Sequence, residues 1–425
     1  MPDSGEVPQL PVVSRLPEIL APAGDLVKLQ AALAWGADAV YLAAGDYGLR
    51  AAHTAFSPED LVQAVGLAHR AGAAVRVTLN ILARPGDLAP PLEAAIDAIR
   101  DAGADAVIVA DPALLLRVRR RAPELAIHIS TQMSVSNAET ARFWADQGAE
   151  RIVLARELTL DEIAAIYREV GDQVELEAFV HGSMCVAWSG RCLLSDAMTG
   201  RGANRGACAG SCRWSYALVE EKRPGEAWPI EEDGHGTYLL SSRDLCLIEH
   251  VPQLIEAGIS AFKIEGRARS AAYAAVATGA YRRAVDLWAA VGTDSWRVDP
   301  DWLLDLESLP HRPYDTGFYF ARPEQEARLS PAVRQLQPAV WYGRVLADDA
   351  FAGQGTGLAC LQTSRLRLGD EVTLLRPDGS RESFAVTRIL DEEGREIPAT
   401  PHPMMRFRLP DAPAAPEHSL LRSGI

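Results

Sequence analysis

The fold is decided by a short pattern that recurs along the chain: WGADAV at Trp35–Val40, RAGAAV at Arg70–Val75, DAGADAV at Asp101–Val107, DQGAERI at Asp146–Ile152 and EAGISAF at Glu256–Phe262. In each copy a helical stretch ends on a glycine, which tolerates the left-handed conformation in which helices commonly end. The residues after the glycine are typical of a buried parallel strand. Each copy therefore predicts a helix, a short turn and a strand, the unit from which α/β folds are built.

Eight segments have the composition of strands in one parallel sheet. They read EILAP, DAVYLA, AAVRVTLNIL, DAVIVAD, AIHISTQ, RIVLA, VELEAFVHG and AFKIEG. Because helical stretches alternate with them, the connections are expected to be right-handed crossovers. Eight such units predict an α/β fold of the (β/α)8 TIM-like barrel type. The main alternative is a doubly wound open sheet, but no glycine-rich phosphate-binding fingerprint follows the first strand.

The 425 residues are enough for more than one domain. Residues 1–14 are polar and contain prolines, which is typical of a disordered tail. The barrel is expected over residues 15–298, with a cysteine-rich insertion, the cysteine segment, at residues 178–250. The YLLSS run at residues 238–242 of this insertion is a further possible strand. Six prolines between residues 299 and 340 indicate a linker or boundary region. From residue 341 to 425 alternating runs separated by turn residues predict a small C-terminal β-barrel domain.

Charge and hydropathy restrict the class of protein. The formal net charge is −15, which counts against general affinity for nucleic acid, although a local basic patch is enough to bind RNA. The chain shows no charged start followed by an apolar run and no apolar run of about 18 or more residues. We therefore expect no signal peptide, no membrane span and a cytoplasmic location.

Five of the six cysteines lie between positions 185 and 246, at Cys185, Cys192, Cys208, Cys212 and Cys246. Thiols stay reduced in the cytoplasm, so this clustering favours metal ligation, cluster ligation or catalysis over disulfides. Only Cys208 and Cys212 resemble the close pair of a structural zinc site. Four dispersed thiolates hold an iron–sulfur cluster equally well. The spacing leaves a cluster, zinc and incidental cysteines open.

Polar side chains collect towards the predicted carboxyl ends of the strands, where barrel enzymes carry their active sites. Glu175 and Glu177 alternate along one strand, so both point to the same face, into the barrel or towards its mouth. A buried carboxylate needs a cation, which Lys263 or Arg267 of the last strand could supply. These residues could serve catalysis or form a structural ion-pair network.

Other candidates follow from their position near the cysteines or the strand ends. His181 precedes Cys185 by four residues and could order the cysteine loop, donate a proton or be structural. Arg156 and Arg267 could grip a carboxylate bidentately. The candidate catalytic residues are Glu177, His181, Lys263 and Glu265, and the candidate substrate-binding residues are Gln132, Asn137, Arg156, Glu157 and Arg267.

Long motifs in this chain resemble one known family. They are HGSMCVAWSGRCLLS, NRGACAGSCRWSY and SSRDLCLI, with LPEILAPAGDLVKLQAALAWGADAVYLA near the start and FKIEGRARSAAYAA and HRPYDTGFY later. All are similar to the collagenase-like peptidase family numbered U-thirty-two. The resemblance covers roughly residues 16 to 320 and, more loosely, the C-terminal region.

The resemblance implies a function that the spacing alone does not. Members with assigned roles include oxygen-independent hydroxylation factors for tRNA, rRNA and ubiquinone that carry a 4Fe-4S cluster. Carried over by position, the ligands are Cys185, Cys192, Cys208 and Cys246, with Cys212 as a possible substitute for Cys246. The C-terminal domain, which the smaller ubiquinone-type members lack, implies prephenate-dependent 5-hydroxylation of the wobble uridine. The implied partners are tRNA and a small carboxylate such as prephenate.

Two other functions stay open at this point. The family name implies a metal- or thiol-dependent peptidase, yet the chain contains neither HExxH nor GxSxG. A thiol peptidase could pair Cys185 with His181, but the other clustered thiols would then be unexplained. The third possibility is a non-catalytic subunit of a hydroxylase complex. The sequence does not set the oligomeric state, the RNA position or the hydroxyl donor.

Overall fold

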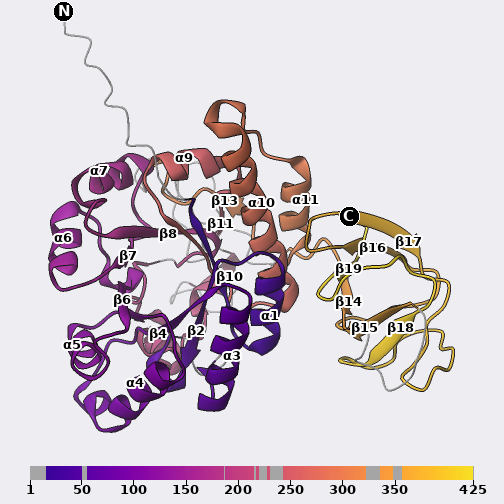
Figure 1. The fold of residues 1–425 in the computed structure, drawn as a ribbon, viewed down its shortest axis with the longest axis horizontal. Coiled ribbons are helices and arrows are strands. Elements are labelled where there is room, and N and C mark those ends of the chain that lie inside the picture. Colours follow the sequence, from indigo (N-terminus) through magenta and orange to yellow (C-terminus); the bar gives the residue numbers. More distant parts are fainter. Residues whose placement is uncertain are drawn as a thin grey trace, which may run out of the picture.

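The computed structural model describes residues 16–49, 55–185, 187–214, 217–219, 227–229, 243–321, 336–347 and 357–424. The tail expected at residues 1–14 and a possible strand at 238–242 lie outside the described residues. Within them the chain forms a barrel of strands ringed by helices, and a smaller β domain lies beside it (Figure 1).

The barrel is built from eight parallel strands: β1 (Glu18–Pro22), β2 (Ala39–Ala44), β4 (Ala74–Leu79), β5 (Ala106–Val109), β6 (Ala126–Ile129), β7 (Arg151–Val153), β8 (Glu175–Ser183) and β12 (Ala261–Ile264). They pair in chain order, and β12 lies between β8 and β1, which closes the sheet. The predicted (β/α)8 class and all eight predicted strands are confirmed. An open sheet is excluded because no gap is left between β12 and β1.

Helices surround the barrel (Figure 1): α1 (Leu26–Ala34), α3 (Pro58–Arg70), α4 (Pro91–Asp101), α5 (Pro112–Arg121), α6 (Ala138–Asp146), α7 (Leu160–Val170), α9 (Val251–Glu256) and α10 (Ala271–Ser295). The glycine of each recurring motif has a φ between 76° and 91°, as the pattern predicts. None of the helices that the structure describes is long and apolar enough to cross a membrane.

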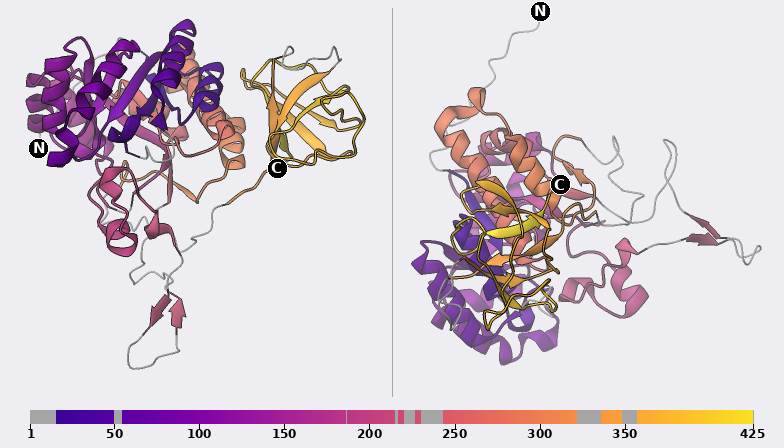
Figure 2. Two further views of the ribbon diagram at one scale, coloured as in Figure 1. Left: turned by 90° about the horizontal axis from the view of Figure 1, so that it is seen from below. Right: turned by 90° about the vertical axis from the view of Figure 1, so that its right-hand side faces the viewer.

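Short elements extend this frame. Strand β3 (Ala55–Phe56) pairs with β2, β11 (Asp244–Cys246) runs antiparallel to β8, and β13 (Tyr314–Asp315) runs parallel to β11. Helix α8 (Leu194–Thr199) and the strand pair β9 (Ala217–Val219) and β10 (Ala227–Pro229) belong to the cysteine segment, which projects from one end of the barrel (Figure 2). Single 3-10 turns occupy Gly45–Tyr47, Pro85–Leu88, Thr131–Met133, Ala203–Arg205, Ser211–Arg213 and Ile248–His250.

Residues 299–340, for which a linker was expected, contain regular structure. Helix α11 spans Pro300–Ser308, and the Asp299 side chain caps it by accepting a hydrogen bond from the Asp301 amide. Its Trp302 is buried in the main core of the barrel domain. Helix α11 and strand β13 therefore pack as parts of the barrel domain.

The C-terminal domain is an antiparallel half-barrel. Its strands are β14 (Trp341–Val345), β15 (Leu358–Gln362), β16 (Glu371–Leu375), β17 (Arg381–Ala385), β18 (Arg406–Leu409) and β19 (Leu420–Ser423). They pair in the order β17-β16-β19-β14-β15-β18 around a separate apolar core. The expectation of a small C-terminal β domain is confirmed.

A buried carboxylate joins the two domains. Asp305 of α11 is fully buried, and Arg381 of β17 lies 2.9 Å from it. Arg283 of α10 and Arg422 of β19 lie 3.5 and 3.9 Å away. Burial raises the pKa of Asp305, and the arginines oppose that shift. Because a buried carboxylate left without its cations is costly, this cluster fixes how the half-barrel sits on the barrel.

Candidate functional site

A cavity of about 340 Å³ lies where the barrel strands end and the cysteine segment begins. Its inner wall consists of side chains from β2, β4, β5, β7, β8 and β12 and from the segment after β6. They include Tyr41, Thr78, Phe179 and Lys263. Its outer wall is formed by residues between Met184 and Arg213. A cavity at this end of a closed barrel is where such folds place their chemistry.

Four thiols line this cavity, and they come from Cys185, Cys192, Cys208 and Cys212. The amide of Leu194 donates to the Cys192 sulfur over 3.4 Å, and the amide of Gly210 donates to the Cys208 sulfur over the same distance. Both sulfurs therefore accept a backbone hydrogen bond from the residue two positions further along the chain.

Cys246 lies elsewhere. It is on β11, is absent from the cavity wall, and its sulfur is hydrogen-bonded to Tyr281 of α10. Burial raises the pKa of Cys246 to about 12, so this sulfur is a neutral thiol at pH 7. Cys212 instead lies close enough to Cys185 and Cys208 for their charges to affect its ionisation. The structure therefore groups Cys212, and not Cys246, with the other three cysteines.

The four cavity thiols suit an iron–sulfur cluster or a zinc ion in number and in kind. Among the residues that the structure describes, no three His, Cys, Asp or Glu side chains stand close enough together to hold a metal ion. Cys185 and Cys208 are exposed. Binding such a group would therefore require the cysteine segment to draw its thiols inwards.

Arg156, at the end of β7, ties the cysteine segment to the barrel. Its guanidinium donates to the Ser189 hydroxyl at 2.6 and 3.1 Å and to the Ser183 carbonyl at 3.0 Å. It also lies 3.7 Å from the Cys185 sulfur and stacks over Phe179 at 4.8 Å. This arginine, predicted to bind substrate, therefore has a clear role in placing the first cysteine.

The inner wall carries two cations and a carboxylate from the last strand and the loop after it. Lys263 lies 4.6 Å above the ring of Tyr41, and Arg267 donates to the Thr78 hydroxyl at 3.1 Å. Glu265 accepts from the Tyr41 hydroxyl at 3.4 Å. Three of the predicted residues therefore meet in one cavity, as their strand-end positions suggested.

Gln132 also lines the cavity and is 6% exposed. Its side-chain oxygen is buried and has no hydrogen-bond partner among the described residues. Its backbone oxygen accepts from Arg191, and a β-carbon on Gly190 would come within 1.9 Å of the side-chain oxygen. The cysteine loop thus packs directly on this amide, and a ligand in the cavity could donate a hydrogen bond to it.

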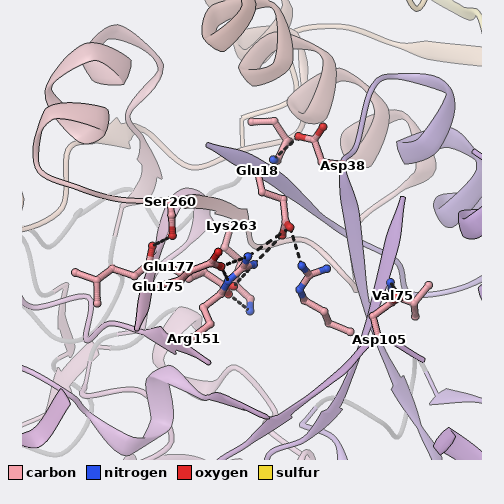
Figure 3. Close-up of polar contacts among 12 residues, drawn as sticks. Glu18, Asp38, Val75, Asp105, Arg151, Glu175, Glu177, Ser260 and Lys263 are labelled. Atoms are coloured by element: carbon pink, nitrogen blue, oxygen red, sulfur yellow. Dashed lines mark hydrogen bonds and ion pairs between the residues drawn. The ribbon is translucent and has the colours of Figure 1, made fainter. Parts of the chain in front are cut away.

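The opposite end of the barrel interior is filled by ion pairs (Figure 3). Arg151 lies between Glu18, at 2.8 Å, and Glu175, at 2.5 Å. Lys263 reaches Glu177 at 2.6 Å, and Arg151 lies 3.5 Å from the same carboxylate. Burial alone would raise the pKa of Glu177, but Lys263 and Arg151 lower it overall. Glu177 is therefore an ionised structural partner outside the cavity wall, and Lys263 connects both regions.

His181 also lies away from the cavity. Its ring packs against Tyr273 and Tyr281 of α10 and against Tyr314 of β13. Both ring nitrogens are buried without a hydrogen-bond partner in the part of the chain that the structure describes. Burial lowers the pKa of His181 to about 3. A neutral imidazole among three tyrosines is not placed to activate Cys185.

Asn137 and Glu157 are the remaining predicted residues, and neither lines the cavity. Asn137 is the N-cap of α6, where its side chain accepts from the Thr140 amide at 2.8 Å. Glu157 follows β7 and is half-buried, and burial raises its pKa. Asn137 therefore has a structural role that its sequence, Asn before an alanine-rich helix, already indicates.

Comparison with known proteins agrees with this architecture. The family model described as peptidase family U32 matches residues 24–329, and that described as the U32 C-terminal domain matches residues 342–422. The chain belongs to peptidase family U32. The two matched regions correspond to the barrel and the half-barrel, and the predicted family resemblance is confirmed.

The relatives of this U32 chain include proteins whose names state an activity. Over 402 residues it is 37% identical to tRNA hydroxylation protein P1 of Bacillus subtilis (strain 168), covering 94% of this chain and 93% of that protein. Over 431 residues it is 33% identical to tRNA hydroxylation protein P of Escherichia coli (strain K12), covering 91% of each. Over 270 residues it is 39% identical to a 23S rRNA 5-hydroxycytidine synthase of Escherichia coli (strain K12), covering 63% of this chain and 39% of that protein.

Sequence reasoning missed several residues of the U32 site. Thr78, Asn80 and Ser130 line the cavity from β4 and the segments after β4 and β6. The signal was present, since Thr78 and Asn80 alternate with buried Val77 and Leu79. Short neutral side chains are harder to recognise as site residues from sequence than charged ones, although they shape a cavity equally well.

Proposed function

We propose that this chain is an iron–sulfur enzyme that hydroxylates RNA, acting at carbon 5 of the wobble uridine of tRNA without molecular oxygen and with prephenate as co-substrate. One observation carries the proposal: four thiols line the cavity at the barrel end in a chain similar over most of its length to proteins named for tRNA hydroxylation. The rRNA hydroxycytidine synthase among the relatives extends the same support to RNA in general.

In this proposal Cys185, Cys192, Cys208 and Cys212 hold a 4Fe-4S cluster. A bound cluster would supply a redox-active or Lewis-acidic iron centre beside the substrate. A zinc ion is the alternative occupant of the same thiols. We choose Cys212 over Cys246, the fourth ligand that the family resemblance implies, because Cys212 lines the cavity and Cys246 does not.

The chain's own residues divide the remaining work. Arg156 holds the loop that carries Cys185 against the strand ends. Lys263 and Arg267 give the cavity positive charge, which complements a small carboxylate such as prephenate, and burial reduces the screening by water. Glu265 is the carboxylate in the cavity wall that can accept a proton from a bound substrate.

The test begins with protein purified without oxygen. Iron, sulfide and the visible absorption spectrum are measured for the wild type and for the Cys185→Ala, Cys212→Ala and Cys246→Ala variants. We expect roughly four irons per chain, lost in the Cys185 and Cys212 variants and kept in the Cys246 variant. The buried Cys360 of the half-barrel offers a second control.

Nucleoside analysis by mass spectrometry then tests the reaction. tRNA from a strain lacking this protein should lack 5-hydroxyuridine and its derivatives, and the wild-type gene and the Cys246→Ala variant should restore them. Zinc in place of iron, or unchanged tRNA nucleosides in the deletion strain, would contradict the proposal. Thiol- or metal-dependent proteolysis by cluster-free protein would favour the peptidase function instead.

A further inference from the structure

The cysteine segment exposes large apolar side chains. Among its described residues Trp188 and Trp214 are each 44% exposed, Met198 is 45% exposed and Leu193 is 68% exposed. Four such side chains on one short segment are unusual on a soluble surface, where large apolar groups are normally scattered. The segment stands on the outside of one barrel end, so its surface can meet another molecule (Figure 2).

Both tryptophans are next in sequence to residues that line the cavity. Ala187 and Ser189, on either side of Trp188, line the cavity wall, and so does Arg213, which directly precedes Trp214. Each indole is exposed and belongs to a residue next in sequence to the cavity wall.

The part of the segment that lines the cavity has a charge opposite to that of the whole protein. This part, residues 185–214, contains four arginines and one aspartate, in a chain with a net charge of −15. Arg191 and Arg201 are exposed, whereas Arg205 is paired with Asp87 at 2.7 Å. A local basic surface on an acidic protein directs an anionic partner to one place.

We propose that this surface, the tryptophan rim formed by Trp188, Trp214, Arg191 and Arg201, binds an unpaired loop of RNA. The inference rests on the proposed function and adds where the RNA binds and in what conformation. The two indoles stack on the nucleotides next to one base that is turned into the cavity, and the two arginines contact the phosphates. Aromatic side chains beside cations are the means by which proteins hold single-stranded nucleic acid.

The cavity itself favours an unpaired base over a duplex or a peptide. An enzyme that acts on a ring atom of a base must take that base out of its stack, which costs least in a loop. The buried side-chain oxygen of Gln132 lacks a partner among the described residues and can accept from an N–H on the Watson–Crick edge of a pyrimidine. In a paired base that edge is already occupied.

Binding measurements on the full chain test the rim directly. Fluorescence anisotropy under anaerobic conditions would measure binding of two RNAs. One is a hairpin whose loop contains uridine, and the other is a blunt duplex with the sequence of the hairpin's stem. We expect the wild type to prefer the hairpin. Trp188→Ala and Trp214→Ala should each weaken hairpin binding by about fivefold to a hundredfold and leave the weak duplex binding unchanged. The corresponding Trp→Phe variants should lose less, because a phenyl ring still stacks.

Matched variants separate the rim from general effects. Phe143 on α6 is an aromatic residue that is 54% exposed and does not line the cavity, so Phe143→Ala should bind the hairpin as the wild type does. Arg201→Ala should lower the dependence of the logarithm of affinity on the logarithm of salt concentration by roughly 0.7. Iron content and thermal unfolding of every variant show whether the segment has kept its structure.

The outcomes distinguish this inference from the function on which it rests. If the wild type binds the hairpin and the tryptophan variants match Phe143→Ala, the rim is overturned while RNA hydroxylation stands. If the variants keep RNA binding but lose a co-purifying protein, the rim is a protein interface and the inference is wrong. If the wild type binds no RNA and the deletion strain has normal tRNA nucleosides, the proposed function fails first.

Discussion

The two ends of the barrel interior both contain charged and polar side chains, but one end is filled by ion pairs and the other is an open cavity. At one end Glu177 is fully buried and meets Lys263 and Arg151, so the space is closed by charge pairs. At the other end Gln132 leaves an oxygen without a partner among the described residues, and four thiols face a cavity of about 340 Å³. Buried polar groups that are fully hydrogen-bonded stabilise the structure, whereas a buried polar group without a hydrogen-bond partner is available to a ligand.

Lys263 belongs to both ends, and its position shows how they are connected. Its ammonium bonds to Glu177 below and lies over the ring of Tyr41 in the cavity wall. Burial lowers the pKa of Lys263, and the charge of Glu177 opposes that shift. The carboxylate at the ion-paired end therefore holds the Lys263 ammonium in place beside the cavity. Substitutions at the ion-paired end should mainly affect stability, and those at the cavity end should mainly affect function.

The largest effect on stability is expected at the closed end. Glu177→Ala leaves Lys263 buried without its carboxylate and should lower the free energy of unfolding by about 3–5 kcal/mol. Glu175→Ala removes a carboxylate from the same Arg151, but the Glu175 side chain is 43% exposed, so a loss of less than about 1 kcal/mol is expected. Urea denaturation of both variants checks this. Equal losses would show that the buried pair is not what closes this end.

A smaller loss of stability with a larger loss of function is expected at the open end. Arg156→Ala leaves the Ser183 carbonyl and the Ser189 hydroxyl without their donor, which should cost about 1–3 kcal/mol. Because the same arginine positions Cys185, bound iron and tRNA hydroxylation should fall much further than stability does.

The surface pair of Arg142 with Glu169, at 42% and 58% exposure, provides the control for Arg156. Arg142→Ala should change unfolding by less than about 1 kcal/mol and leave the iron content as in the wild type. Arg156→Lys keeps the charge but not the planar fork, so it should recover only part of the iron. Full iron content in Arg156→Ala would remove this residue from the site.

The effect that is smallest at neutral pH concerns the response to acid. Burial lowers the pKa of His181 from 6.5 to about 3, so between these values the unfolded chain binds a proton that the folded chain does not. This contribution to stability is complete above pH 6.5 and falls by about 1.4 kcal/mol per pH unit on acidification. His181→Phe should reduce the slope of unfolding free energy against pH by that amount near pH 5. The exposed His402, changed to Phe, controls for removal of an imidazole, and an unchanged slope in His181→Phe would contradict the assignment.

The barrel could be predicted from sequence because its strands are buried on both faces. Each of the eight strands follows a helix-ending glycine or a turn and is short and rich in apolar residues. The elements that were not predicted are two to four residues long, such as β3, β13 and β19. Segments this short do not show the alternation of apolar and polar residues that marks a strand. Helix α11 carried a signal, since Asp299 followed by Pro300 is a common helix start. The density of prolines around it suggested a linker instead.

The location of a site residue was predictable where its position along a strand decides which way its side chain points. It was not predictable where a local irregularity in the strand pairing changes that direction. Lys263 or Arg267 was expected to supply the cation for Glu177, and Lys263 does so. Arg151 and Glu18, which complete that network, stand at the beginnings of their strands, where active-site reasoning does not look. His181 is turned towards α10 next to a register shift between β8 and β12 at Lys263 and Ile264, and no residue pattern announces such a shift.

The closure of the barrel by β12 sets an order of events during synthesis. The cysteine segment leaves the ribosome before β12 does, yet the cavity wall needs Lys263 from β12 and Arg267 just after it. The inner wall of the cavity is complete only when β12 pairs with β8 and β1. Until then the growing chain carries four reduced thiols next to an unfinished sheet. Any group that these thiols bind would therefore be enclosed only after β12 has been made.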